Sequence, residues 1–302
     1  MKILITGGAG YIGSILTPLL LSHGHHVTVI DRFIYGETSL AALCGNPRFD
    51  VYRVDCRDRS AVMPHLKDAD VIIPLAGLVG VPLGDLNPVD AELLNLDSQL
   101  GLFDDCSASQ VIIMPTTESQ YGSNAAICDE TTPVNPLSTY ARHKVAVEQA
   151  LMQRPNSVSL RLATVFGMSP RMRIDLLIND FTWRAYKERS IVIFEGHYKR
   201  TSVHVSDVAR AFVHALTLNP GIYNVGAVVT TKIELCEAIR RQLPDFVWVE
   251  ANTKWDTDQR NYVVSDAKLR GSGFTPQVTL DAGITELLKG YRMLTNTRYG
   301  NV

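Results

Sequence analysis

The stretch MKILITGGAGYIGSILTPLLL, residues 1–21, decides the fold of this chain. Its apolar run at residues 3–5 is typical of a buried parallel strand, and three glycines follow it at intervals of three residues. Apolar side chains then recur at helical spacing between Ile12 and Leu20. The stretch therefore predicts a strand, a glycine turn and a helix in direct succession.

The glycine turn predicts a site for a pyrophosphate. Gly7 allows a tight turn, Gly10 leaves no side chain between a phosphate and the backbone, and Gly13 lets the helix pack closely on the strand. The phosphates would lie at the N-terminus of the helix, where free N–H groups and the helix dipole favour negative charge. Three glycines alone are a weak signal, so the residues that follow have to support this interpretation.

A second apolar strand, residues 27–30, ends in Asp31, which lies 18 residues after Gly13. A carboxylate at this place accepts hydrogen bonds from the ribose hydroxyls of adenosine and repels a 2′-phosphate, so it favours NAD over NADP. The neighbouring Arg32 could weaken that preference. The alternative is an ordinary strand-helix-strand unit with a surface aspartate.

Further apolar runs of strand length alternate with helical segments along the chain, at residues 49–54, 70–75, 110–114 and 157–162. This alternation predicts an α/β fold, a Rossmann doubly wound parallel sheet. The later part of the chain shows no linker and no repeat, which favours a smaller, discontinuous C-terminal substrate-binding domain. We expect an NAD-binding domain of residues 1–166 with 201–227, and a second domain of residues 167–200 with 228–302.

The composition argues against several function classes. A net charge of −2, with scattered Lys and Arg, provides no basic patch for a nucleic acid. Five cysteines at irregular spacing fit reduced thiols and no metal site, and the histidines at 23, 25 and 26 fit a solvated turn. The first strand begins at residue 2, and no apolar run nears the roughly 20 residues of a membrane span. We therefore expect a cytosolic protein that does not bind a membrane.

The third and fourth predicted strands end at the same crevice as the first two. Asp55 either bonds the adenine amino group or caps the following helix. Ala76 and Gly77 are small enough to let a cofactor lie against the backbone. Asn95, inside a helix predicted over residues 89–108, either pins a loop or the catalytic residues, or makes an ordinary structural hydrogen bond.

A hydroxyl-rich segment, residues 115–122, follows the fifth predicted strand, and Tyr140 and Lys144 begin a helix predicted over residues 139–152. Because they are four residues apart, both side chains lie on one face of that helix, and the ammonium can approach the phenol. A Tyr and a Lys at this spacing mean little alone. Their place after five strands of a Rossmann series favours a catalytic pair over a surface pair.

Several segments together carry a family resemblance: TGGAGYIG at 6–13, Asp31, Asp55, LAG at 75–77, TTESQYG at 116–122, YARHK at 140–144, RLATVFG at 161–167 and RTSVHVSDVARA at 200–211. Over nearly its full length, the chain resembles the extended short-chain dehydrogenase/reductase family, and within it the nucleotide-sugar epimerases and dehydratases. The resemblance implies NAD as cofactor, a nucleotide-diphosphate sugar as substrate, and a homodimer formed through the helices of residues 89–108 and 139–152. The predicted cofactor-binding residues are Gly7, Gly10, Tyr11, Ile12, Gly13, Asp31, Arg32, Asp55, Cys56, Leu75, Ala76, Gly77, Asn95, Tyr140 and Lys144.

By this resemblance, Tyr140 is the catalytic acid and base, Lys144 holds the ribose hydroxyls and lowers the pKa of the phenol, and Thr117 bonds the reacting sugar oxygen. A nearby ammonium and a positively charged nicotinamide both favour the phenolate. The resemblance also implies residues that grip the nucleotide diphosphate, since the planar fork of arginine can bind phosphate through two hydrogen bonds. These residues are Asn179, Arg200 and Arg260, and Arg171 and Arg173 are further candidates to face the sugar.

Two departures from the pattern of the family bear on the reaction. The 4,6-dehydratases carry an Asp-Glu pair directly after the catalytic threonine, where this chain has Glu118 and Ser119. Glu118 could still act as an acid on the substrate, but Ser119 cannot replace a carboxylate that abstracts a proton. A full dehydratase is therefore disfavoured. Residues 164–167 stand in place of the usual Asn-Val-Tyr-Gly and blur the sugar specificity.

We expect an NAD-dependent nucleotide-sugar epimerase that acts at C4 through a transient 4-keto sugar. The alternatives among enzymes are an NADH- or NADPH-dependent 4-keto-sugar reductase, and a dehydratase or decarboxylase on the same scaffold. Outside enzymes, the alternative is a redox sensor that binds the dinucleotide without turnover. That class usually lacks the Tyr and Lys that this chain carries.

Overall fold

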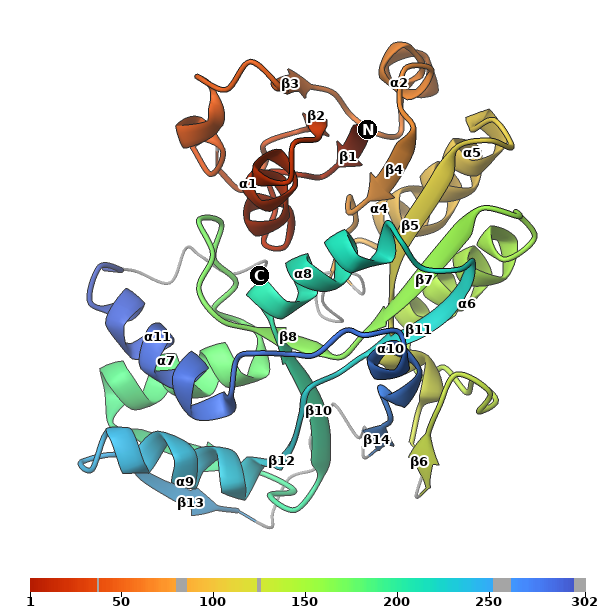
Figure 1. Ribbon diagram of the computed structural model, residues 1–302. Helices are drawn as coiled ribbons and strands as arrows, with labels where there is room; N and C mark the ends of the chain where they lie inside the picture. Colours follow the sequence, from red (N-terminus) through yellow and green to blue (C-terminus); the bar gives the residue numbers. More distant parts are fainter. Residues whose placement is uncertain (37, 80–85, 124–125, 252–261, 296–302) are drawn as a thin grey trace.

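The computed structural model describes residues 1–36, 38–79, 86–123, 126–251 and 262–295 (Figure 1). Within these residues, seven parallel strands form one sheet in the order β11-β7-β5-β4-β1-β2-β3. This order confirms the predicted doubly wound Rossmann sheet, in which ligands bind where the strand order reverses, here between β1 and β4. The strands are β1 (Lys2–Thr6), β2 (His26–Asp31), β3 (Phe49–Arg53), β4 (Val71–Pro74), β5 (Val111–Thr117), β7 (Ser157–Leu162) and β11 (Gly221–Val225).

The central strands are buried on both faces, which explains their unbroken apolar runs. On β1, Ile3 and Ile5 pack into one layer and Leu4 packs into the other, because successive side chains of a strand point to opposite faces. The first layer holds α1 (Gly13–Ser22) and α8 (Val205–Ala215), and the second holds α2 (Arg59–Leu66), α5 (Ser98–Asp105) and α6 (Thr139–Leu151).

The helix predicted over residues 89–108 is interrupted by one π-helical turn. Its parts are α4 (Pro88–Glu92), the turn η2 (Leu93–Asp97) and α5. The turn carries Asn95, which is buried and bonded to the backbone of the loop after β4. A π-turn inserts an extra residue and re-aims side chains, and a run of leucines does not reveal it in the sequence.

A second core lies beside the sheet, where α7, α9 and α11 gather (Figure 1). These elements are joined by three small sheets with the strand orders β12-β10-β8, β13-β9 and β14-β6. The remaining elements of the described residues are η1 (Ala41–Leu43), η3 (Glu118–Tyr121), β6 (Ile127–Cys128), β8 (Thr164–Phe166), α7 (Leu177–Glu188), β9 (Ser190–Ile193), β10 (Lys199–His204), β12 (Val228–Thr231), α9 (Lys232–Gln242), β13 (Val247–Glu250), β14 (Val263–Val264), α10 (Ala267–Gly271) and α11 (Leu280–Tyr291).

The two cores motivate a division into two domains, and the boundaries given above stay a proposal. Strand β10 lies in a small sheet, whereas β11 belongs to the large one, so the chain crosses between the two regions more than once. In the described ranges, no helix is long and apolar enough to cross a membrane.

Candidate active site

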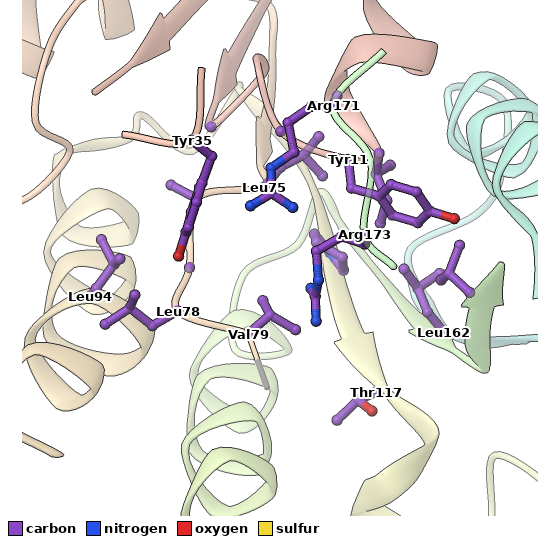
Figure 2. A pocket seen from close by; sticks show the side chains of 18 of the residues that line it. Tyr11, Tyr35, Leu75, Leu78, Val79, Leu94, Thr117, Leu162, Arg171 and Arg173 are labelled. Atoms are coloured by element: carbon purple, nitrogen blue, oxygen red, sulfur yellow. The ribbon is translucent and has the colours of Figure 1, made fainter. Parts of the chain in front are cut away.

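A cavity of about 330 Å³ lies at the carboxyl ends of the central strands (Figure 2). Many of the residues predicted from the sequence line it: Gly7, Gly10, Tyr11, Ile12, Gly13, Asp31, Arg32, Cys56, Leu75, Ala76, Gly77, Thr117, Tyr140 and Lys144. Five other predicted site residues are not part of its lining: Asp55, Asn95, Glu118, Asn179 and Arg200. Arg260 lies outside the described residues.

The glycine turn brings the ends of β1 and β4 and the start of α1 close together. Gly7 has a φ of +70°, and a Cβ there would lie 2.6 Å from the Cα of Ala76. A Cβ on Gly13 would lie 2.4 Å from the carbonyl oxygen of Gly8. Gly10 is different, because its Cβ would meet only the carbonyl oxygen of Gly7, at 3.1 Å. Gly7 and Gly13 are therefore needed for packing, and Gly10 leaves open space at the cavity.

Asp31 is held in place at the end of β2 by two backbone N–H groups. Its Oδ2 accepts a hydrogen bond from the N–H of Ala9 at 3.0 Å, and its Oδ1 accepts one from the N–H of Phe33 at 2.7 Å. Because each carboxylate oxygen has more than one lone pair, both can still accept a hydroxyl. The carboxylate is thus oriented beside the glycine turn, where a ribose would lie.

Asp55, two residues after β3, does not line the cavity and forms ion pairs with two arginines. It pairs with Arg57 at 2.7 Å and with Arg32 at 3.4 Å, and these hydrogen bonds and charges, that of Arg57 foremost, lower the pKa of its carboxyl. The N-cap of α2 is Asp58, which accepts from the N–H groups at 60 and 61. The capping interpretation of Asp55 was therefore wrong, since the capping residue lies three positions later. The neighbouring Cys56 does line the cavity, and burial raises the pKa of its thiol to about 11.

Asn95 pins a loop, one of the roles that the sequence allowed. Its Oδ1 accepts from the N–H of Leu78 and its Nδ2 donates to the carbonyl of Leu78, both at 2.9 Å. Gln99 supports the same loop by donating to the carbonyl of Ala76 at 3.2 Å. The small residues after β4 are thereby fixed along the wall of the cavity.

The phenol, the ammonium and the hydroxyl of the predicted catalytic group line one cavity. Lys144 lies on α6 with its Nζ 6.0 Å from the ring centroid of Tyr140, and it donates to the carbonyl of Pro115 at 3.1 Å. Burial lowers the pKa of Lys144 to about 8. Thr117 ends β5, and its Oγ1 accepts from the N–H of Ser119 at 3.2 Å and lies 2.9 Å from the Oγ of Ser119.

Glu118 is directed away from this cavity. Its carboxyl group is buried, and neither oxygen has a hydrogen-bond partner among the described residues. Burial, with smaller contributions from Asp266 and Glu130, raises its pKa well above the usual range, which favours the protonated form of the carboxyl group. Glu118 does not line the cavity, so its contact with the substrate stays a prediction. Strand β5 ends at Thr117, and Glu118 begins the turn η3, whose side chains are buried.

Asn179 and Arg200 are buried outside the cavity. The side-chain amide of Asn179 accepts from the N–H of Gly167 at 3.0 Å and donates to the hydroxyl of Tyr11 at 3.1 Å and to the carbonyl of Arg173 at 2.8 Å. With these bonds, Asn179 orders the chain between β8 and α7. The sequence motif does not reveal this internal network, and the contact of Asn179 with substrate stays a prediction.

Two arginines from the segment before α7 reach the cavity. In Figure 2, Arg171 is directed toward Tyr35 and Arg173 toward Thr117. The guanidinium of Arg171 lies 4.0 Å from the ring centroid of Tyr35, and Arg173 pairs with Asp175 at 2.5 Å. The sequence indicated both arginines as candidates, but Tyr35 was missed because a tyrosine in a loop carries no periodic signal.

The comparisons with known proteins agree with this geometry. A family model described as the NAD dependent epimerase/dehydratase family matches residues 3–226. The chain belongs to this family. It is 27% identical to a putative UDP-glucose 4-epimerase of Methanocaldococcus jannaschii, covering 95% of this chain and 97% of that protein. It is 28% identical to UDP-glucuronic acid decarboxylase 1 of Arabidopsis thaliana, covering 97% of this chain and 70% of that protein.

Solved structures share the whole fold. The UDP-glucose 4-epimerase of Thermus thermophilus in complex with NAD has a TM-score of 0.83 at 26% identity, covering 97% of this chain and 99% of that one. The UDP-glucuronic acid 4-epimerase of Bacillus cereus, in complex with UDP-glucuronic acid and NAD, has a TM-score of 0.87 at 24% identity, covering 98% and 100%. This protein is thus an enzyme of the epimerase/dehydratase type with NAD as its cofactor.

The residues of this chain fit that cofactor. Gly10 lines the cavity three residues before α1 begins, and free N–H groups at the start of a helix attract phosphate. The oriented carboxylate of Asp31 suits the ribose hydroxyls of adenosine. Lys144, Tyr140 and Thr117 lie in the same cavity, where the nicotinamide end and a sugar would meet.

Proposed function

We propose that this enzyme is an NAD-dependent nucleotide-sugar epimerase that inverts C4 through a transient 4-keto sugar. The single observation that carries the proposal is that Thr117, Tyr140 and Lys144 line one cavity with the glycine turn. UDP is the first nucleotide to test, because the named relatives are a putative UDP-glucose 4-epimerase and a UDP-glucuronic acid decarboxylase.

In this mechanism, Tyr140 moves the proton of the reacting hydroxyl. When bound, NAD supplies a reversible acceptor for the hydride of C4. The phenolate oxygen of Tyr140 takes the proton from the 4-hydroxyl as the C4–H bond breaks, which leaves a ketone. After the sugar turns over, Tyr140 returns the proton to the oxygen on C4, and the product is the C4 isomer of the substrate.

Lys144 and Thr117 support this transfer. The pKa of Lys144, about 8, leaves it charged at pH 7, and a charged ammonium near the phenol favours the phenolate. The hydrogen bond to Pro115 sets the direction of the ammonium. The two contacts from Ser119 orient the hydroxyl of Thr117, which we assign to the sugar oxygen.

The scarcity of acidic residues in the described cavity lining argues against a reaction that eliminates water. Among the described residues that line it, Asp31 is the only acid, and it lies at the adenosine end. Ser119 bonds Thr117, and Glu118 is buried behind it. A 4,6-dehydratase needs a carboxylate base near the sugar, so this lining favours an epimerase.

The test is a substrate panel. The purified protein is incubated with UDP-, GDP-, CDP-, ADP- and dTDP-sugars, with and without added NAD, and proton NMR follows the coupling that reports the configuration at C4. We expect a new C4 isomer with one sugar, no conversion by Tyr140→Phe although it keeps NAD, and normal conversion by Tyr52→Phe, an exposed tyrosine outside the cavity. Turnover by Tyr140→Phe would remove the assigned base. Steady consumption of NADH or NADPH with a 4-keto sugar would identify a reductase instead.

Several expectations from the sequence stay predictions. These are the homodimer through the helices of residues 89–108 and 139–152, the cytosolic location, and the binding of a nucleotide diphosphate by Arg200 and Arg260. Size-exclusion chromatography with light scattering tests the dimer.

A further inference from the structure

The segment between β8 and α7 is fastened to the glycine turn. The hydroxyl of Tyr11 donates to the carbonyl of Gly167 at 2.7 Å, and the hydroxyl of Ser169 donates to the carbonyl of Tyr11 at 2.7 Å. The hydroxyls of Ser169 and Ser14, in the first turn of α1, lie 2.8 Å apart. These groups are all buried, so the segment has a fixed position over the N-terminus of α1.

Arg171 follows Ser169 by two residues and reaches the cavity from this fixed position. Its side chain is 7% exposed, and its guanidinium lies 4.0 Å from the ring centroid of Tyr35 (Figure 2). Tyr35 comes from the loop after β2, the same loop that follows Asp31. The contact between Arg171 and Tyr35 thus links the segment before α7 to the loop that follows Asp31.

Arg171 and Arg173 bring two positive charges to the cavity, and the acids that act on Arg171 are Asp175 and Asp31. Burial, together with the charge of Arg173, lowers the pKa of Arg171 to about 10, so the guanidinium is charged at pH 7 and repelled by its neighbour. Asp175 pairs with Arg173 at 2.5 Å. The pyrophosphate of a dinucleotide is anionic, and a planar guanidinium can bind it through two hydrogen bonds.

We propose that Arg171 binds the pyrophosphate of NAD on the side opposite the glycine turn, and that Tyr35 is the positioning residue that holds its guanidinium flat. The N–H groups of the turn and of α1 hold the phosphates from one side, and Arg171 holds them from the other. The sequence placed Arg171 toward the sugar, whereas its stacking on Tyr35 directs it toward the cofactor. The inference concerns NAD itself and does not depend on which sugar reaction the enzyme catalyses.

Binding measurements without any sugar test this inference. Calorimetry on the full chain, freed of bound nucleotide, gives the Kd for NAD, ADP-ribose and adenosine. We expect Arg171→Met to weaken NAD and ADP-ribose by about 10-fold to 100-fold and to leave adenosine unchanged, because only the first two carry a pyrophosphate. Arg171→Lys recovers part of the loss. Tyr35→Phe binds like the wild type, and Tyr35→Leu shows a smaller loss than Arg171→Met.

A matched control removes another arginine that lies over an aromatic ring. Arg53 lies 5.1 Å from the ring centroid of Phe33 but does not line the cavity, so Arg53→Met keeps the Kd for NAD. An unchanged Kd for NAD in Arg171→Met overturns the proposal. So does an equal loss for adenosine, which indicates a deformed pocket, or a loss confined to the nucleotide sugar. Thermal unfolding confirms that each variant is folded.

Discussion

Glu148 of α6 and Arg161 of β7 form an ion pair in the interior, with 2.5 Å between Oε1 and Nη2 and both side chains 5% exposed. Glu148 also accepts hydrogen bonds from the hydroxyl of Ser159 at 2.6 Å and from that of Thr116 at 3.0 Å. A carboxylate accepts several such bonds, and here they come from two neighbouring strands. Helix α6 is therefore fixed against the sheet at this point.

Glu148 lies on the same helix face as Tyr140 and Lys144, the proposed catalytic pair. Tyr140, Lys144 and Glu148 follow each other at intervals of four residues, so they lie in one row along α6. Lys144 bonds the carbonyl of Pro115, and Glu148 bonds the side chain of the next residue of β5. The helix is thus held in register with the strand directly before Thr117.

We expect Glu148→Gln to lower the free energy of unfolding by about 3 kcal/mol, because it leaves the guanidinium of Arg161 buried without its counter-charge. Urea unfolding followed by circular dichroism measures the loss. Arg59→Gln, which breaks a surface pair with Asp105, serves as the control and should cost much less than Glu148→Gln. A loss in Glu148→Gln no larger than in this control would contradict the prediction.

Substitutions in the glycine turn should affect two different properties, stability at Gly7 and cofactor binding at Gly10. Gly7→Ala is expected to destabilise the protein by more than about 2 kcal/mol, because the new Cβ meets the backbone of Ala76 at a positive φ. Gly10→Ala should stay within about 1 kcal/mol of the wild type and bind NAD about 10-fold more weakly, because its methyl group occupies the approach of a phosphate. Thermal unfolding and calorimetry measure the two effects. Equal NAD affinity in Gly10→Ala and wild type would show that phosphate does not approach there.

The sheet could be predicted from the sequence because its physics is local. A strand covered on both faces needs an unbroken apolar run, and residues 3–5 and 71–73 are such runs. The glycine turn was equally predictable, since contacts of 2.6 Å or less to a Cβ leave no other residue for Gly7 and Gly13. Strand ends then converge on one edge, which is why Asp31 and Thr117 were found.

The sequence says less about side chains whose direction is set by distant contacts. Glu118 is a candidate for the substrate because it follows Thr117, yet the turn η3 begins at this residue and its side chain is buried. The side-chain amide of Asn179 bonds Gly167, Tyr11 and Arg173, and no spacing in the sequence reveals these three contacts. The role of a loop residue such as Tyr35 depends on contacts with partners more than a hundred residues away in the sequence, here Arg171.

Lys144 should make stability depend on pH above neutrality. Its pKa falls from 10.5 to about 8 on folding, so between these values the unfolded chain binds a proton that the folded protein has lost. Stability from this group therefore rises with pH from about 8 to 10.5, by up to about 3 kcal/mol. Urea unfolding of the NAD-free protein at about pH 7.5 and about pH 10 measures the change, and Lys144→Met should remove it. The same pH dependence in both proteins would assign it to other groups.

Glu118 should show the opposite pH dependence and no catalytic role. Its pKa is raised on folding from about 4.5, so its contribution to stability is complete below that value and is lost as the pH rises toward the pKa of the folded state. We expect Glu118→Gln to be more stable than the wild type at about pH 7.5, and less so or not at all at about pH 4.5, because the amide never ionises.

Measurements of turnover distinguish a purely structural role of Glu118 from the role as an acid that the sequence suggests. Glu118→Gln should keep kcat and KM near those of the wild type, while Thr117→Val, which removes a hydroxyl inside the cavity, lowers kcat. A loss of kcat on the order of 100-fold in Glu118→Gln, without loss of NAD, would instead identify the carboxyl as an acid in the reaction. It would also require the group to turn from the interior toward the sugar, since both of its oxygens are buried away from the cavity in this structure.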